Sequence, residues 1–217
     1  MTPHRLRRAV IVAGGNVGAW ALQLLRHDDY VIGADSGAAF LIRHRRTPDL
    51  ALGDFDSVSA DERAAIRAAA AEWLDCDAYD KNWTDTEWAL REAAARGCRD
   101  IVLAGALGTR FDHSFANVQL LRTARELGCE ATLVDERNEI RLCTGECRLE
   151  ADSRFDYVSL LPLSPIVTGI TLTGFRYPLK DATIAAGQSL GVSNVLERPP
   201  GTVSIAGGEL LVIRSRD

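Results

Sequence analysis

The chain lacks a long run of apolar residues. No segment of its 217 residues approaches the roughly 20 apolar residues that a helix needs to cross a bilayer. The apolar segment behind the basic N-terminus, residues 9–13, is too short to be the core of a signal peptide. We therefore expect no membrane partner and a cytoplasmic location.

A disulfide framework is missing as well. The five cysteines are odd in number and irregular in spacing, so they predict no set of disulfides. Cys143 and Cys147 are four positions apart, but no second pair and no nearby histidine would complete a zinc site. We interpret all five as ordinary buried or half-buried thiols.

The chain also has no excess of positive charge. Its net charge is −5 and its isoelectric point is about 5.4. Proteins that bind the phosphate backbone of nucleic acids are usually basic, so we expect no nucleic-acid partner. An acidic protein can still bind ATP when its carboxylates surround a metal ion.

Short apolar runs alternate with helical patterns as far as about residue 135. Strands are predicted at 9–13, 30–33, 50–52, 101–104 and 131–134, and helices at 17–26, 38–45, 59–71, 84–96 and 112–127. Ser59 with Glu62 and Thr84 with Glu87 have the capping-box spacing that opens helices. This alternation predicts a parallel sheet covered by helices on both faces.

The pattern changes after about residue 135. Helical periodicity ends, and short β-rich runs follow at 157–161 and 166–168. Gly207-Gly208 separates the runs 203–205 and 210–213, which is typical of a hairpin. We predict a small all-β domain, sandwich or barrel. The expected domains are 1–138, which is α/β, and 139–217, which is all β.

Acidic side chains follow several of the predicted strands. Asp35 follows one strand, and Asp54 and Asp56 follow the next; if the latter segment is still extended, both carboxylates project to one side. A magnesium ion is the usual means of relieving their repulsion. Asp85 and Asp112 lie at helix starts. A polar turn or a helix cap explains any one of these residues equally well, but their common sheet edge favours a ligand site.

A glycine-rich segment, residues 105–110, precedes the helix that begins near Asp112. Glycines let the backbone approach an anion, and the following helix N-terminus offers free N–H groups. Arg110 adds a forked donor suited to phosphate, and Lys81 is either a second phosphate partner or a solvated lysine. The P-loop ending is absent. Together with the acidic residues, these features suggest phosphoryl-group transfer from a magnesium nucleotide.

Six ordered segments, spread over about 160 residues, resemble those of one family, thiamine pyrophosphokinase. They are Asp35-Ser36-Gly37-Ala38; Pro48-Asp49 with Gly53-Asp54-Phe55-Asp56-Ser57; Lys81 with Thr84-Asp85-Thr86-Glu87; Gly108 to His113 with Asn117; Gly174-Phe175-Arg176-Tyr177-Pro178-Leu179; and Gly191-Val192-Ser193-Asn194. Ser36, Ala39, Asn82, Trp88 and Thr109 depart from the family pattern, which leaves the four candidate metal carboxylates intact.

The resemblance implies a Rossmann-like, ATP-binding catalytic domain followed by a β-sandwich that binds thiamine. It implies transfer of the pyrophosphoryl group of Mg-ATP to thiamine, giving thiamine diphosphate and AMP, in a homodimer with thiamine at the subunit interface. The implied site residues are Asp35, Asp54, Asp56 and Asp85 for catalysis and Mg²⁺; Lys81, Thr84, Arg110, Asp112, His113 and Asn117 for ATP; and Tyr177, Ser193 and Asn194 for thiamine. Stacking of the cationic thiamine ring on Tyr177 is physically reasonable.

Two alternatives remain open from the residues. The α/β half would also suit a diphosphokinase that acts on another hydroxymethyl heterocycle, such as a pterin. A non-catalytic regulator that binds thiamine or a nucleotide is the second alternative, although no candidate acidic ligand is missing.

Overall fold

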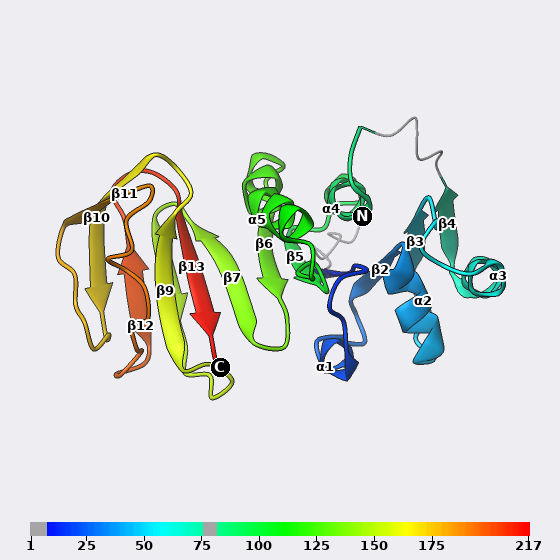
Figure 1. Ribbon diagram of the computed structural model, residues 1–217, viewed down its shortest axis with the longest axis horizontal. Coiled ribbons are helices and arrows are strands. Elements are labelled where there is room, and N and C mark those ends of the chain that lie inside the picture. Colours follow the sequence, from blue (N-terminus) through cyan, green and yellow to red (C-terminus); the bar gives the residue numbers. More distant parts are fainter. Residues whose placement is uncertain (1–7, 76–81) are drawn as a thin grey trace, which may run out of the picture. The chain divides into compact units, whose positions relative to one another are not determined.

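The structure is a computed structural model that describes residues 8–75 and 82–217. The chain forms two compact units, one ending at Glu136 and the other comprising Arg137–Asp217 (Figure 1). The division lies near the predicted boundary between residues 138 and 139. No helix in the described part of the chain is long and apolar enough to cross a membrane.

The strands of the first unit pair in the order β4-β3-β2-β1-β5-β6, and every pair is parallel, as predicted. Their bounds are Arg8–Val12 (β1), Tyr30–Ala34 (β2), Leu50–Gly53 (β3), Glu72–Asp75 (β4), Asp100–Ala104 (β5) and Glu130–Val134 (β6). The sequence prediction missed β4, a short strand with exposed ends. Its few apolar residues make too weak a pattern to recognise.

The helices of the first unit cover both faces of these strands (Figure 1). They are Ala19–Leu22 (α1), Ser36–Arg43 (α2), Ala60–Ala69 (α3), Asp85–Ala95 (α4) and Phe111–Glu126 (α5). Residues of α1 and α2 share a buried cluster with Val10 and Val12 of β1. The intervening Ile11 is also fully buried, and α4 packs on β1 and β2.

The helix predicted over residues 17–26 is mostly wrong, because α1 has one turn. The backbone groups that would continue it are engaged elsewhere. The carbonyl of Leu24 accepts a hydrogen bond from Arg8 at 2.6 Å. The N–H of Arg26 donates to the carboxylate of Asp29 at 2.7 Å. These side-chain contacts, one of them from the distant Arg8, therefore replace helical hydrogen bonds beyond α1.

The strands of the second unit pair antiparallel in two groups, each part of a different sheet. In one, β13 (Leu210–Ser215) lies between β7 (Asn138–Cys143) and β9 (Tyr157–Pro162); the other has the order β11 (Ala182–Ala185), β10 (Ile166–Thr173), β12 (Gly201–Ser204) and β8 (Glu146–Leu149). Buried apolar residues from both sheets form one core. The predicted all-β character of this half is confirmed.

The hairpin predicted around Gly207-Gly208 is wrong. The strand before the glycines, β12, pairs with β10 and β8, whereas the strand after them, β13, pairs with β7 and β9. Val203 and Leu210 both contribute to the shared core. The glycine loop therefore carries the chain from one sheet to the other, because each strand buries its apolar side chains against the opposite sheet.

Candidate functional site

A pocket of about 770 Å³ opens at the carboxyl ends of the parallel strands in the first unit. Its wall includes the ends of β1, β2 and β5 and the starts of α2 and α4. Most of the residues predicted to act in catalysis or to bind ATP line it: Asp35, Asp54, Asp56, Thr84, Asp85, Arg110, His113 and Asn117. The fold thus brings together side chains that the sequence analysis selected one by one.

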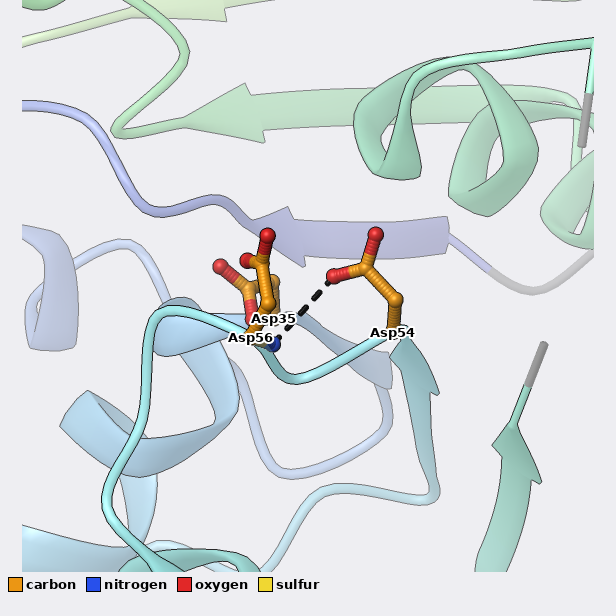
Figure 2. A group of neighbouring side chains, drawn as sticks. All are labelled: Asp35, Asp54 and Asp56. Carbon is orange, nitrogen blue, oxygen red and sulfur yellow. Dashed lines mark hydrogen bonds between the residues drawn. The ribbon is translucent and has the colours of Figure 1, made fainter. Parts of the chain in front are cut away.

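Three of the predicted carboxylates form a compact group. One oxygen from each of Asp35, Asp54 and Asp56 lies within 4.8 Å of the others, and the carboxylates point the same way (Figure 2). Oxygen ligands at this spacing suit a hard divalent cation, of which Mg²⁺ keeps several waters and binds few carboxylates. Asp85 lines the same pocket but is not in this group.

The two carboxylates of the Asp54-Phe55-Asp56 segment do not converge by strand alternation, contrary to the sequence interpretation. Strand β3 ends at Gly53, and the chain then turns with Phe55 in the left-handed region at φ 55°. The Phe55 side chain is buried and stacks on Trp73, with ring centroids 4.0 Å apart. The buried ring anchors the turn, and the aspartates on either side of it line the pocket.

Asp35 also has an unusual backbone. It precedes α2 with φ 50°, and its side chain makes no capping hydrogen bond to the helix. Its N–H donates to the carbonyl of Leu52 at 2.9 Å, which continues the pairing of β2 with β3. The hydroxyl of Ser57 donates to Asp35 Oδ2. Asp35 Oδ1 is buried, and no described residue gives it a hydrogen bond, so this oxygen suits a cation ligand.

Thr84 and Asp85 begin α4 at the pocket wall. The Thr84 hydroxyl oxygen accepts the N–H of Glu87 at 3.2 Å, so Thr84 is the cap residue of this helix. The Glu87 carboxylate is held by Arg91 at 2.8 Å. Of the two hydrogen bonds of the predicted capping box, only the one from the Glu87 N–H to Thr84 is among the described contacts of α4. At Ser59 both hydrogen bonds of the capping box are present.

The glycine-rich segments after β1 and β5 are joined by backbone hydrogen bonds. The N–H of Gly15 donates to the carbonyl of Gly105, and that of Asn16 donates to the carbonyl of Leu107, both at 2.7 Å. A Cβ on Gly15 would lie 2.4 Å from these two oxygens, so the close approach requires glycine. Neighbouring glycine-rich loops of this kind, at the carboxyl ends of strands, suit an anionic ligand.

Three predicted ATP contacts, Asn117, Arg110 and Asp112, also make contacts within the first unit. The buried side chain of Asn117 donates from Nδ2 to the carbonyl of Ala106 at 2.7 Å. Arg110 and Asp112 form a two-point ion pair, 2.6 Å at its shorter contact. The hydrogen bonds from Arg110 hold the pKa of the Asp112 carboxyl at about 2. Asp112 does not line the pocket, whereas Arg110 does.

The remaining predicted residues lie elsewhere. Lys81 lies outside the described residues. Tyr177, Ser193 and Asn194 lie together in the second unit. Asn194 is buried, its Nδ2 donates to the Tyr177 carbonyl at 2.7 Å, and its Oδ1 accepts the Tyr177 N–H at 3.1 Å. The Tyr177 side chain is 61% exposed. Asn194 therefore fixes the backbone that presents Tyr177.

Sequence reasoning assigned no role to three residues near the acidic group. Ser57 was named only as the last residue of the segment Gly53–Ser57. Its hydrogen bond to Asp35 joins residues that are 22 positions apart. Trp73 supports Phe55 from a strand that was not predicted. Trp83 lines the pocket and is 44% exposed. Only its place between Lys81 and Thr84 could have drawn attention to it.

Two family models match the chain. The model described as "Thiamin pyrophosphokinase, catalytic domain" matches residues 21–133. The model described as "Thiamin pyrophosphokinase, vitamin B1 binding domain" matches residues 146–210. The first match lies within the unit that holds the acidic pocket, and the second lies within the unit that holds Tyr177.

Individual proteins agree with these matches. A thiamine pyrophosphokinase of Bacillus subtilis is 37% identical over 187 residues, which are 86% of this chain and 87% of the relative. The crystal structure of a Bacillus subtilis thiamine pyrophosphokinase is similar with a TM-score of 0.90 and 34% identity, covering 97% of this chain and 100% of the other.

The crystal structure of a thiamin pyrophosphokinase from Geobacillus thermodenitrificans is similar with a TM-score of 0.87 and 34% identity, covering 97% of this chain and 98% of the other. The yeast enzyme shares the fold, with a TM-score of 0.81 at 13% identity, over 99% of this chain and 88% of the other. The resemblance noted in the sequence motifs is therefore confirmed along most of the chain, and the chain belongs to the thiamine pyrophosphokinase family.

Proposed function

We propose that this chain transfers the pyrophosphoryl group of ATP to thiamine, giving thiamine diphosphate and AMP. The observation that carries the proposal is the group of three carboxylates in a pocket that also presents two glycine-rich loops and Arg110. This pocket lies in the unit that matches the family's catalytic domain. The two alternatives named from the sequence gain no support from the family matches or the relatives.

Asp35, Asp54 and Asp56 would hold Mg²⁺, and Asp85 would face it from the start of α4. When bound, the ion supplies positive charge beside the transferring phosphates. The hydroxyl oxygen of thiamine attacks the β-phosphorus of ATP in line. The new O–P bond forms as the bond from that phosphorus to the oxygen of AMP breaks, and the hydroxyl proton is released.

The cationic and polar side chains of the pocket would position the triphosphate. Arg110 offers a planar fork suited to phosphate oxygens, and Thr84 and His113 line the same wall. Lys81 and Asp112 are further candidates from the resemblance. In this chemistry the protein acts mostly by positioning groups and stabilising charge.

We further propose that the first unit is a Rossmann-like catalytic domain, and that the second unit is a β-sandwich that binds thiamine through Tyr177, Ser193 and Asn194. The support is the match of the second unit to the vitamin B1 binding domain. A homodimer with thiamine at the subunit interface, and a cytoplasmic location, stay predictions. Light scattering on the purified protein tests the first of these.

The activity is tested by incubating the purified protein with Mg-ATP and thiamine and measuring the products. We expect AMP and thiamine diphosphate in equal amounts. ADP with thiamine monophosphate would mean that a single phosphoryl group is transferred. Turnover of a hydroxymethyl pterin, or thiamine binding with no product, would favour one of the two alternatives.

A further inference from the structure

Two segments that are distant in the sequence meet at the acidic group. Asp35 follows β2, and Ser57 belongs to the turn after β3. The Ser57 hydroxyl donates its hydrogen bond to Asp35 Oδ2. Both residues line the pocket. This hydrogen bond joins the last residue of the turn after β3 to Asp35, the one carboxylate of the group of three that lies outside this turn.

The backbone of Asp35 is held independently of its side chain. Its N–H is bound to the Leu52 carbonyl. A Cβ on Gly53 would lie 3.2 to 3.3 Å from backbone and Cβ atoms of Asp35, so the end of β3 packs closely against it. The position of the Asp35 α-carbon is therefore fixed by the sheet. The rotation of its carboxylate is left to side-chain contacts.

Among the described residues, Ser57 makes a side-chain hydrogen bond to this carboxylate. It holds Oδ2, while Oδ1 is the buried oxygen to which no described residue donates. The same Asp35 side chain makes no cap to α2. One carboxylate oxygen is thus restrained by a hydroxyl proton, and the other is left for a ligand.

Ser57 is itself held at both sides in the sequence. Two positions before it, the buried Phe55 ring stacks on Trp73. Two positions after it, the Ser59 capping box begins α3, with the Ser59 N–H donating to Glu62 at 3.1 Å. The backbone is therefore held on both sides of Ser57, which keeps its hydroxyl beside the Asp35 carboxylate.

We propose that Ser57 is a positioning residue that orients Asp35, so that Asp35 Oδ1 faces the same divalent cation as Asp54 and Asp56. The inference rests on the proposed function, because that function supplies the cation. Groups that hydrogen-bond a ligating carboxylate tune metal affinity, and their removal commonly weakens binding about 10–100-fold.

The test uses Mn²⁺ alone as the probe, measured by loss of the free-ion electron paramagnetic resonance signal, with no ATP or thiamine present. Ser57→Ala should raise the Mn²⁺ dissociation constant about 10-fold or more. Ser57→Thr keeps the hydroxyl and should bind Mn²⁺ like the wild type. Ser204→Ala is the matched control, because its hydroxyl donates to the Thr171 carbonyl in the second unit and does not line the pocket.

Turnover gives a second readout. Ser57→Ala should raise the Mg²⁺ concentration for half-maximal rate, with most of kcat recovered at saturating Mg²⁺. Circular dichroism verifies that each variant is folded. Unchanged Mn²⁺ binding in Ser57→Ala, or no Mn²⁺ binding in the wild type, would overturn the inference. Mn²⁺ binding that depends on Ser57 in a protein that makes no thiamine diphosphate would instead overturn the proposed activity and leave the positioning role standing.

Discussion

Asp35 and Phe55 both adopt left-handed backbone conformations at the acidic group, with φ values of 50° and 55°. Such conformations cost a residue other than glycine roughly 1–3 kcal/mol and persist only where surrounding contacts determine them. Here the contacts are the Asp35 N–H bond to Leu52 and the Phe55 stack on Trp73. The strain is thus balanced by packing outside the pocket, and the carboxylates remain available inside it.

Asp54→Asn should reduce turnover at least about 100-fold, because a bound cation contributes several kcal/mol to stabilising the transferring phosphates. The melting temperature should stay the same or rise, since the substitution relieves repulsion among the three carboxylates when no cation is bound. Asp61→Asn, on α3 and away from the pocket wall, is the control. Near-normal turnover of Asp54→Asn would contradict the metal-ligand role.

Tyr177→Ala should raise the Michaelis constant for thiamine about 10-fold, with a smaller change for ATP. Loss of stacking on a cationic ring costs on the order of 1–2 kcal/mol, and the exposed Tyr177 side chain contributes little to the core. Tyr177→Phe keeps the ring and should behave like the wild type. Steady-state kinetics with each substrate varied in turn measures this, and equal effects on both constants would argue against stacking.

The helices that begin at the pocket are started by different means. α4 has the Thr84 hydroxyl as its cap, whereas α2 follows Asp35 without a side-chain cap. α5 begins after Arg110, also without a side-chain cap. The Thr84 hydroxyl oxygen accepts the N–H of Glu87, and its proton is still able to donate to a phosphate. The uncapped start of α2 leaves the Asp35 carboxylate for the proposed cation.

Thr84→Ala should lower the free energy of unfolding by about 1 kcal/mol, because the N–H of Glu87 loses its acceptor. Thr84→Ser should restore most of this loss. Urea denaturation followed by circular dichroism measures it. Ser59→Ala removes the cap of α3 and serves as a second comparison. Both cap variants should lose stability, but only Thr84→Ala should also raise the Michaelis constant for ATP, and equal kinetics in the two would contradict the proposed role of Thr84.

An ion pair in the first unit links its stability to pH. The Arg8 guanidinium, on β1, lies 2.7 Å from the Asp29 carboxylate, whose side chain is 1% exposed. Burial alone would raise the pKa of Asp29, but the hydrogen bonds from Arg8 and from the N–H of Arg26 outweigh it and lower that pKa below its usual value. The stabilisation is therefore fully present above the unfolded-state pKa of about 3.9, and is lost as the pH falls through the folded-state value.

Asp29→Asn should accordingly lower the free energy of unfolding of the first unit by about 3 kcal/mol at pH 7, because the Arg8 guanidinium loses its buried, charged partner. The difference from the wild type should shrink as the pH falls below about 4. Circular dichroism at 222 nm is a suitable probe, since all the described helices lie in the first unit. A difference that does not change between pH 7 and pH 3 would show that the ion pair is not its source.

Local patterns were sufficient for all the parallel strands except β4, most of the helices, the change to an all-β second half and the list of candidate carboxylates. These features depend on neighbours a few positions apart, such as the Ser59 capping box or the apolar run of β1. The same patterns failed where distant contacts decide the outcome. The early end of α1 depends on Arg8 and Asp29, and the path of the chain after β12 depends on the core between two sheets.

The arrangement of the pocket also needed the folded chain. Motif spacing selected Asp35, Asp54 and Asp56, but the turn anchored by Phe55 and the Ser57 bond to Asp35 decided how these carboxylates point. Backbone strain, ring stacking and hydrogen bonds across 22 positions have no periodic signature in a sequence. They exist only after β2, β3 and β4 have paired, because pairing is what brings their ends to one edge of the sheet.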